Sequence, residues 1–119
     1  GVDVVYDPVG GDYFDIARRL VAWEGRLLVV GFATGSIPSA PANHVLVKNY
    51  SVVGVHMGGY RGVDPAPFKQ CYDEVYQLLL DGKIDPLISE TVGMSDLPRA
   101  LKDLFDRKTT GRIIFDPRL

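Results

Sequence analysis

Runs of consecutive apolar residues alternate along this chain with segments whose apolar positions recur every three or four residues. The clearest run is RLLVVGFATG at residues 26–35, in which aliphatic side chains follow one another and two glycines flank an aromatic and two small residues. A run without polar alternation belongs to a strand that is covered on both faces, as in a parallel sheet between helices. The pattern therefore predicts a buried strand that ends in a glycine-containing loop.

Two other runs share this design. Residues 2–7 are followed by Pro8-Val9-Gly10-Gly11, and residues 50–57 are followed by Gly58 and Gly59. In an open parallel sheet the ligand crevice lies beyond the carboxyl ends of the strands, where glycine lets a ligand approach the backbone. The three ends together predict one ligand-binding edge, with Gly10, Gly31 and Gly58 brought close to one another.

The remaining segments predict four helices and two further strands. A helix over 13–24, with Asp12 as N-cap and Gly25 as C-terminal cap, completes a strand–helix–strand unit. A short helical turn is expected over 44–48, a loop over 58–67, a helix over 68–79, a strand within 84–92, a helix over 97–107 capped by Ser95, and a strand over 112–116.

Composition and charge then exclude several classes of protein. The 119 residues are 46% hydrophobic and carry a net charge of −2, so no basic surface indicates nucleic-acid binding. No apolar run approaches the about 20 residues of a membrane span. Cys71 is the only cysteine, which agrees with a cytoplasmic location, and its place on the apolar stripe of 68–79 predicts a buried thiol. The chain lacks an initiator Met and enters a strand at once, as expected for a fragment.

Five segments resemble the medium-chain dehydrogenase/reductase superfamily, and within it the zinc-independent quinone oxidoreductases related to zeta-crystallin. They are VDVVYDPVGG, EGRLLVVGFATG, LVKNYSVVGVHMGGY, LLLDGKIDPLISETVGMSDLPRAL and TTGRIIFDP. The resemblance implies an α/β fold: residues 1–82 would form the C-terminal half of a Rossmann-type doubly wound parallel sheet. Residues 83–119 would be the C-terminal segment that returns to the substrate (GroES-like) domain.

The resemblance also implies a function and a set of cofactor contacts. The parent protein would be an oxidoreductase, and a homodimer, that transfers hydride from NADPH, with NADH not excluded, to quinones or related enones and carbonyls. This chain alone would be inactive, because the phosphate-binding turn and the residues that read the ribose would precede Gly1. The implied contacts are Pro8, Val9 and Gly10 along the nicotinamide ribose; Gly31, Phe32 and Ala33 beside the nicotinamide; backbone groups of Val55, His56 and Met57 at its carboxamide; and either Arg107 or Arg112.

Several of these residues have a plainer interpretation. Phe32 can instead cap the sheet as a core residue. A histidine near a strand end, such as His56, is more often a hydrogen-bonded structural residue than a proton donor, although it could donate a proton if it faced the crevice. His44 is expected to be solvated, and no metal site is expected from the two histidines and Cys71. Tyr60 and Arg61 would line a substrate pocket or an ordinary loop, and Arg107 and Lys108 would complement the end of the last helix.

Two other functions remain open from the sequence. The chain would be a non-catalytic, self-associating module if the strands at 2–7, 88–92 and 113–115 left unpaired edges, and in the family the strand at 51–57 tends to pair across a dimer. Alternatively, the parent would be a zinc alcohol dehydrogenase or an enoyl reductase of the same superfamily.

Overall fold

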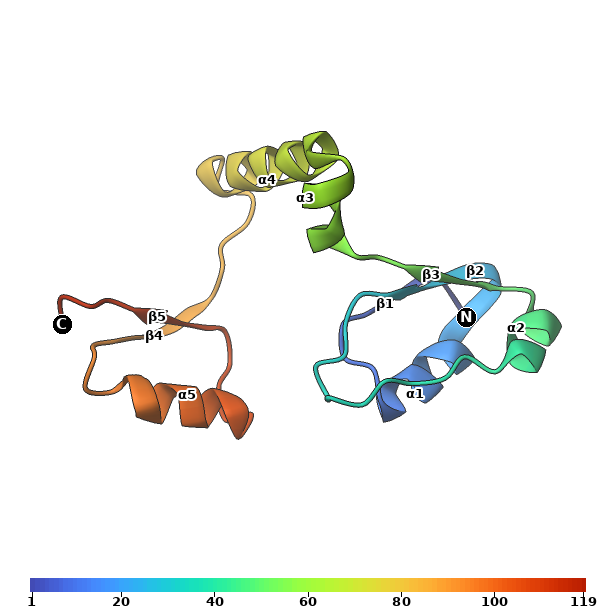
Figure 1. Cartoon of the computed structure of the whole chain (residues 1–119), viewed down its shortest axis with the longest axis horizontal. Coiled ribbons are helices and arrows are strands. Elements are labelled where there is room, and N and C mark those ends of the chain that lie inside the picture. Colours follow the sequence, from blue (N-terminus) through green and yellow to red (C-terminus); the bar gives the residue numbers. More distant parts are fainter. The chain divides into compact units, whose positions relative to one another are not determined.

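The computed structural model describes all residues, 1–119, and Figure 1 shows their elements. The chain forms two compact units, Gly1–Phe68 and Lys69–Leu119, and each is described by itself. The division falls within one helix. The predicted domain boundary at residue 82 stays a prediction.

The first unit is built on a parallel sheet of three strands. β1 (Val2–Asp7), β2 (Val21–Val29) and β3 (Ser51–Gly54) lie in the order β1-β2-β3. In register, Tyr6 of β1 faces Leu28 of β2, which faces Val53 of β3. α1 (Asp12–Leu20) covers one face of the sheet (Figure 1), and α2 (Ala42–Lys48) contacts β2. The buried core is Phe14, Ala17, Val21, Leu27 and Tyr50.

α1 is shorter than the sequence predicts. It ends at Leu20, and Val21, only 1% exposed, already begins β2. The strand then bulges: Val2 pairs with Val21, but Val4 pairs with Arg26, and Glu24 takes a left-handed φ of 59°. Gly25 is therefore a buried bulge glycine and not a helix cap, because a Cβ there would lie 3.0 Å from the Asp3 carbonyl oxygen.

The two ends of α1 are also held differently from the prediction. Gly11 is the N-cap, so Asp12 is the first helical residue and not the cap. At the other end, the Lys48 ammonium donates to the carbonyl oxygens of Arg18, Arg19 and Val21 at 3.3, 2.7 and 2.7 Å. A cation on these carbonyl groups stabilises the negative end of the helix.

The segment expected as a loop after β3 is largely helical. β3 ends at Gly54, and η1 (Met57–Gly59) and α3 (Tyr60–Val63) follow, in place of a strand that continues to Met57. The Arg61 guanidinium lies 4.7 Å from the centre of the Phe68 ring, so its side chain stacks on an aromatic neighbour.

α4 (Pro65–Leu80) agrees with the prediction in its position, because its prolines lie in the first turn, where the missing N–H costs no helical hydrogen bond. Gly82, with a φ of 65°, closes its end, and its N–H donates to Leu79 at 3.0 Å. The expectation of a buried thiol is wrong for this chain: Cys71 is exposed, and no residue of α4 is buried.

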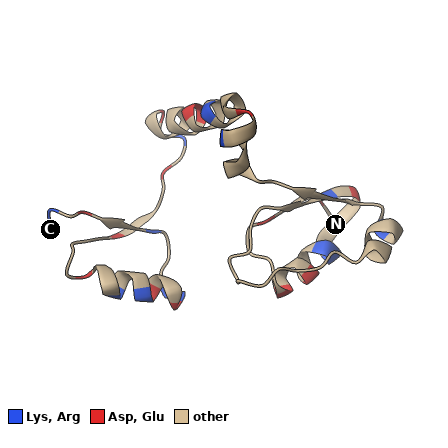
Figure 2. Cartoon of the chain, viewed as in Figure 1, with Lys and Arg blue, Asp and Glu red and all other residues tan.

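The second unit pairs β4 (Ile88–Val92) with β5 (Arg112–Phe115) in parallel, and α5 (Leu97–Phe105) connects them. The two strands thus bond to each other, and in this two-stranded sheet each keeps the unpaired outer edge that the sequence predicts. Asp96, not Ser95, is the N-cap of α5. Positive and negative side chains are interspersed in both units (Figure 2), and ion pairs such as Lys102–Asp106, at 2.7 Å, join neighbouring turns of α5.

Candidate functional site

The loop after β1 is shaped by a buried carboxylate. Asp7 is 5% exposed, and its Oδ1 accepts the N–H groups of Val9 and Gly10, each at 2.9 Å. Gly10 and Gly11 then take positive φ values of 67° and 56°, which other residues rarely adopt. The sequence analysis did not single out Asp7, although an aspartate directly before Pro-x-Gly-Gly is typical of a turn closed by its own side chain.

The loop after β2 is fastened to the loop after β1. The N–H groups of residues 30, 33 and 34 donate to the carbonyl oxygens of residues 7, 8 and 9 at 2.9, 3.2 and 3.0 Å. The Thr34 hydroxyl donates to the Val9 carbonyl at 3.0 Å, and the Gly11 N–H donates to Ser36 at 3.0 Å. A Cβ at Gly31 would lie 3.2 Å from the Pro8 carbonyl oxygen. The Gly10 and Gly31 ends therefore meet, as the sequence predicts.

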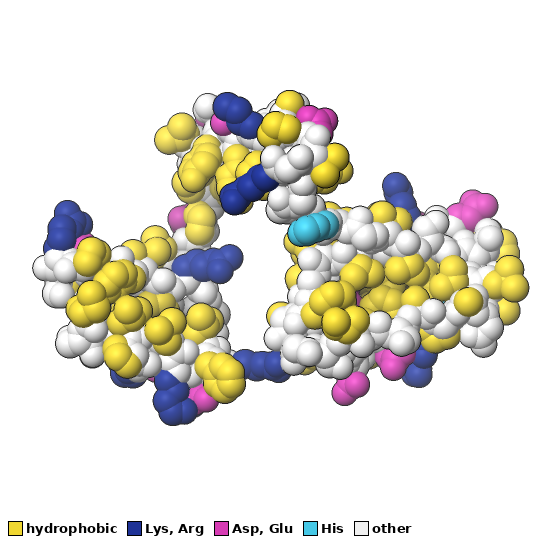
Figure 3. Space-filling view, in the orientation of Figure 1, with side chains coloured by type: hydrophobic (Ala, Val, Ile, Leu, Met, Phe, Trp, Pro, Cys, Tyr) yellow, Lys and Arg dark blue, Asp and Glu magenta, His cyan; other side chains and the backbone are white.

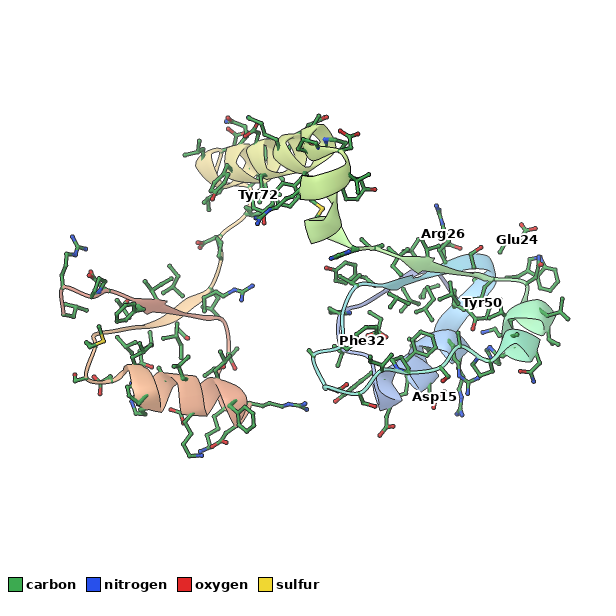
Figure 4. All side chains as sticks on the ribbon, in the orientation of Figure 1. Asp15, Glu24, Arg26, Phe32, Tyr50 and Tyr72 are labelled. Atoms are coloured by element: carbon green, nitrogen blue, oxygen red, sulfur yellow. The ribbon has the colours of Figure 1, made fainter.

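The carboxyl end of β3 closes an apolar hollow beside these loops. The Val55 N–H donates to the Val29 carbonyl at 2.9 Å, which holds the chain beyond β3 against the end of β2. The hollow has a volume of about 210 Å³ and is lined by Val29, Val30, Gly31, Phe32, Gly54, Val55 and His56. Phe32 lies in the loop at the end of β2 and is 41% exposed (Figure 4), so it is not a core residue of this chain.

The predicted cofactor contacts thus fall into three groups. Those in the fastened loops are Pro8, Val9, Gly10, Gly31, Phe32 and Ala33. Val55 and His56 follow β3, and Met57 is the first residue of η1. Gly58 belongs to η1 and does not line the hollow. Arg107 and Arg112 lie in the second unit, where Arg107 closes the end of α5 with a φ of 58° and the Arg112 N–H donates to Leu87 at 2.8 Å.

The two histidines differ in their surroundings. His44 lies in α2, half-buried, with Nδ1 3.3 Å from the Tyr50 hydroxyl, so it is not the solvated loop residue that was expected. Burial, together with the positive charges of Arg18 and Lys48, lowers the pKa of His44, and burial raises the pKa of Tyr50. The His56 ring, by contrast, takes part in no hydrogen bond or ion pair of the chain.

A second hollow adjoins the first through His56. It has a volume of about 360 Å³ and is lined by His56, Gly59, Tyr60 and Val63. Tyr60 therefore faces a cavity, while Arg61 is engaged with Phe68. His56 is the only residue that lines both hollows.

The chemistry available at this edge comes from apolar walls and backbone groups. The N–H groups of Ala33 and Val55 already donate within the chain, so a polar contact from either residue must use its carbonyl oxygen. The chain brings together no group of three or more His, Cys, Asp or Glu side chains that could hold a metal ion.

The parallel α/β fold matches the C-terminal part of the quinone oxidoreductase fold. A structure of Escherichia coli quinone oxidoreductase complexed with NADPH superposes with a TM-score of 0.81 at 23% identity, covering 98% of this chain and 36% of that one. A mycobacterial protein complexed with NADPH superposes with a TM-score of 0.84 at 24% identity, covering 98% and 36%.

Sequence comparison identifies the family. The model of the zinc-binding dehydrogenases matches residues 1–115, so the chain belongs to this family of the medium-chain dehydrogenase/reductase superfamily. The bovine (Bos taurus) quinone oxidoreductase-like protein 2 is 41% identical over 114 residues, which is 96% of this chain and 33% of that protein. The chain thus spans about a third of the length of the curated relatives that it matches. None of its helices combines the length and apolar character that a bilayer crossing demands.

Proposed function

We propose that this chain forms the nicotinamide side of the cofactor site of an oxidoreductase that transfers hydride from NADPH to quinones or related enones and carbonyls. The observation that carries the proposal is the joining of three strand ends at one edge of a parallel sheet. There, two fastened loops and the end of β3 border an apolar hollow of about 210 Å³.

The hollow suits a single ring better than a whole cofactor. Sites for drug-sized ligands have volumes of about 300–1,000 Å³, so this smaller hollow fits one aromatic group of a larger molecule. Gly31 and Gly54 leave its floor without side chains, and Phe32 and Val29 supply apolar walls that exclude water. The remainder of the cofactor would lie along the loop of Pro8, Val9 and Gly10.

When bound, a reduced nicotinamide supplies the hydride, and the protein's part is to orient the ring and keep water away. In this chain the carbonyl oxygens at Val55 and its neighbours would receive the N–H groups of the carboxamide, while Asp7 would hold the ribose-side loop in shape. Arg107 or Arg112 would be a further cofactor contact, as the family resemblance implies. We propose NADPH rather than NADH as the cofactor because two structural neighbours were solved in complex with NADPH.

A nuclear magnetic resonance titration tests the proposal on the chain itself. Uniformly ¹⁵N-labelled protein is titrated with NADPH and, separately, with nicotinamide mononucleotide, which carries only the ring, ribose and one phosphate. We expect amide shifts at residues 9–11, 31–33 and 55–57 with both ligands, and none in the core of α1. Titration with adenosine 2′,5′-bisphosphate is the matched control, and shifts of equal size there would contradict a nicotinamide site.

A second candidate, a self-associating structural module, is favoured by the sheet edges. β1 and β3 are the outer strands, and Val2, Val4 and Tyr6 of β1 are 49%, 47% and 65% exposed. Hydrophobic side chains are visible on the surface of both units (Figure 3). Light scattering distinguishes the candidates: a concentration-dependent mass without nicotinamide-induced shifts supports the module, and a clean monomer counts against it and against the predicted homodimer. A cytoplasmic location stays a prediction.

A further inference from the structure

We propose that His56 supplies the proton that completes the reduction of a conjugated carbonyl compound, and that Gly59 holds its imidazole at the junction of the two hollows. This inference rests on the proposed function and deepens it by naming a catalytic residue. The hollow against β2 would hold the nicotinamide, and the hollow against Tyr60 would hold the substrate.

The position of His56 is the first reason. It is the only residue that lines both hollows, so a group bound in either one lies beside this residue. A proton donor for such a reduction must reach the substrate while the substrate contacts the nicotinamide. A side chain at the junction satisfies both conditions.

The chemistry of the lining residues is the second reason. The first hollow is otherwise walled by aliphatic residues, glycines and Phe32, and the second by Gly59, Val63 and Tyr60. Of all these side chains only His56 and Tyr60 carry a transferable proton, and imidazole is the group that ordinarily exchanges its proton near neutral pH. Tyr60 borders the second hollow alone.

The lack of a hydrogen-bond partner for the His56 imidazole is the third reason. His44, the other histidine, is committed to the Tyr50 hydroxyl and packs edge-on against its ring, with the ring centroids 5.7 Å apart. The His56 ring has no such partner, which argues against a structural histidine. It is also exposed, so that a proton lost to a substrate can be replaced from solvent.

Gly59 acts as a positioning residue for this ring. The Gly59 N–H donates to the His56 carbonyl at 3.0 Å, which bends the backbone back under the side chain. A Cβ at residue 59 would lie 2.8 Å from Nδ1 of the imidazole, closer than such atoms approach, and 3.3 Å from Cε1, which is a tight contact. Any side chain at this position would therefore displace the ring.

The step balances as follows. Hydride addition to the β-carbon of an enone delivers two electrons and one hydrogen and oxidises the nicotinamide. The enolate that results takes a proton at its α-carbon from an imidazolium N–H of His56, which becomes neutral imidazole. Solvent then reprotonates the ring, and the net change is reduction of one C=C bond.

Histidine-selective ¹H–¹⁵N spectra test the location of the ring without any turnover. The chain has two histidines, so the His44 signals serve as an internal reference and the His44→Gln variant assigns them. Nicotinamide mononucleotide should shift the His56 ring signals and leave those of His44 in place. Shifts at residues 31–33 with an unmoved His56 ring would overturn this inference and leave the proposed function standing, whereas no shift anywhere would overturn both.

Turnover by the protein that carries this chain tests the proton transfer, with NADPH and 2-methylcyclohexenone as the probe. The His56→Gln variant should lose about 100-fold or more in kcat while its Kd for NADPH changes less than about 2-fold. The product, whose α-carbon is a stereocentre, should lose its enantiomeric excess, because solvent would then protonate either face of the enolate. Gly59→Ala should lower kcat and the enantiomeric excess in the same direction, and Gly62→Ala, whose Cβ has open space, is the control. A His56→Gln variant with unchanged kcat and stereochemistry would refute the assignment.

Discussion

Replacing Asp7 by alanine should both destabilise the first unit and disorganise the loop that is proposed to carry the cofactor ribose. Its Oδ1 accepts two backbone N–H groups at 2.9 Å, from Val9 and Gly10, and Gly10 is buried where water cannot easily take over. A hydrogen bond to a charged group contributes about 1.5–3 kcal/mol. Because the Val9 N–H can turn to solvent, we expect a total loss of about 2–4 kcal/mol in the free energy of unfolding.

Asp7→Asn is the matched control at the same position. Its amide oxygen can still accept both N–H groups, so only the charge is lost, and we expect a loss of about 1 kcal/mol. Urea denaturation followed by far-ultraviolet circular dichroism measures both variants, with m compared to ensure that the unfolded states are equally open. In ¹⁵N spectra the alanine variant should move the amide signals of Val9 and Gly10 most strongly.

Two results would refute this reasoning. If Asp7→Ala unfolds at the same urea concentration as the unsubstituted chain, the carboxylate does not stabilise the loop. If the asparagine variant loses as much stability as the alanine variant, the negative charge of Asp7, and not its acceptor geometry, stabilises the turn.

Three further variants extend these tests. Lys48→Met removes a cation from three carbonyl groups at the end of α1 and should lower the free energy of unfolding, measured by urea denaturation, by about 1–3 kcal/mol. Lys102→Met, which removes only an exposed ion pair, is the control and should lower it by less than about 0.5 kcal/mol. The pKa of His44 is lowered on folding, so at about pH 6.5 and somewhat below the unfolded chain binds more protons than the folded chain. The free energy of unfolding should therefore fall as the pH drops through this range, and His44→Gln should reduce that pH dependence. Gly31→Val, whose Cβ would lie 3.2 Å from the Pro8 carbonyl oxygen and press the two joined loops apart, should weaken nicotinamide mononucleotide binding about 10-fold or more in the same titration, while Gly62→Ala should not.

The strands were predictable because their apolar runs leave no alternative, and the parallel order followed from the helix between the first two. The end of α1 was not. Residues 21–24 continue the helical spacing of apolar positions, but Val21 is buried in the core as the first residue of β2. Glu24 takes a left-handed conformation, and its N–H donates to the Asn49 carbonyl oxygen at 2.9 Å. That contact joins residues far apart in the sequence, and local periodicity carries no information about it.

The residues of the candidate site also divide into those that the sequence predicts and those that it does not. The glycines that mark the strand ends can be found from sequence, because a positive φ or a close approach excludes other residues. The separate surroundings of His44 and His56 cannot, since each depends on which side chains the fold brings beside the ring: Tyr50 for His44, and Gly59 for His56. The buried role of Asp7 lies between the two, because its turn is local but its burial is not.

Backbone groups suit the proposed nicotinamide site at this edge better than side chains do, for a physical reason. A neutral nicotinamide ring between apolar walls needs orientation more than charge, and carbonyl oxygens held by strand hydrogen bonds cannot rotate away as side chains do. The fastening of residues 30–36 to residues 7–11 makes both loops extensions of the sheet, so their positions depend on the core of Leu27 and Val21. A proton, in contrast, has to come from a group that can gain and lose one. At an edge built of glycine, valine and phenylalanine, the placement of an unbonded imidazole at the junction of two hollows is therefore better explained by chemistry than by packing.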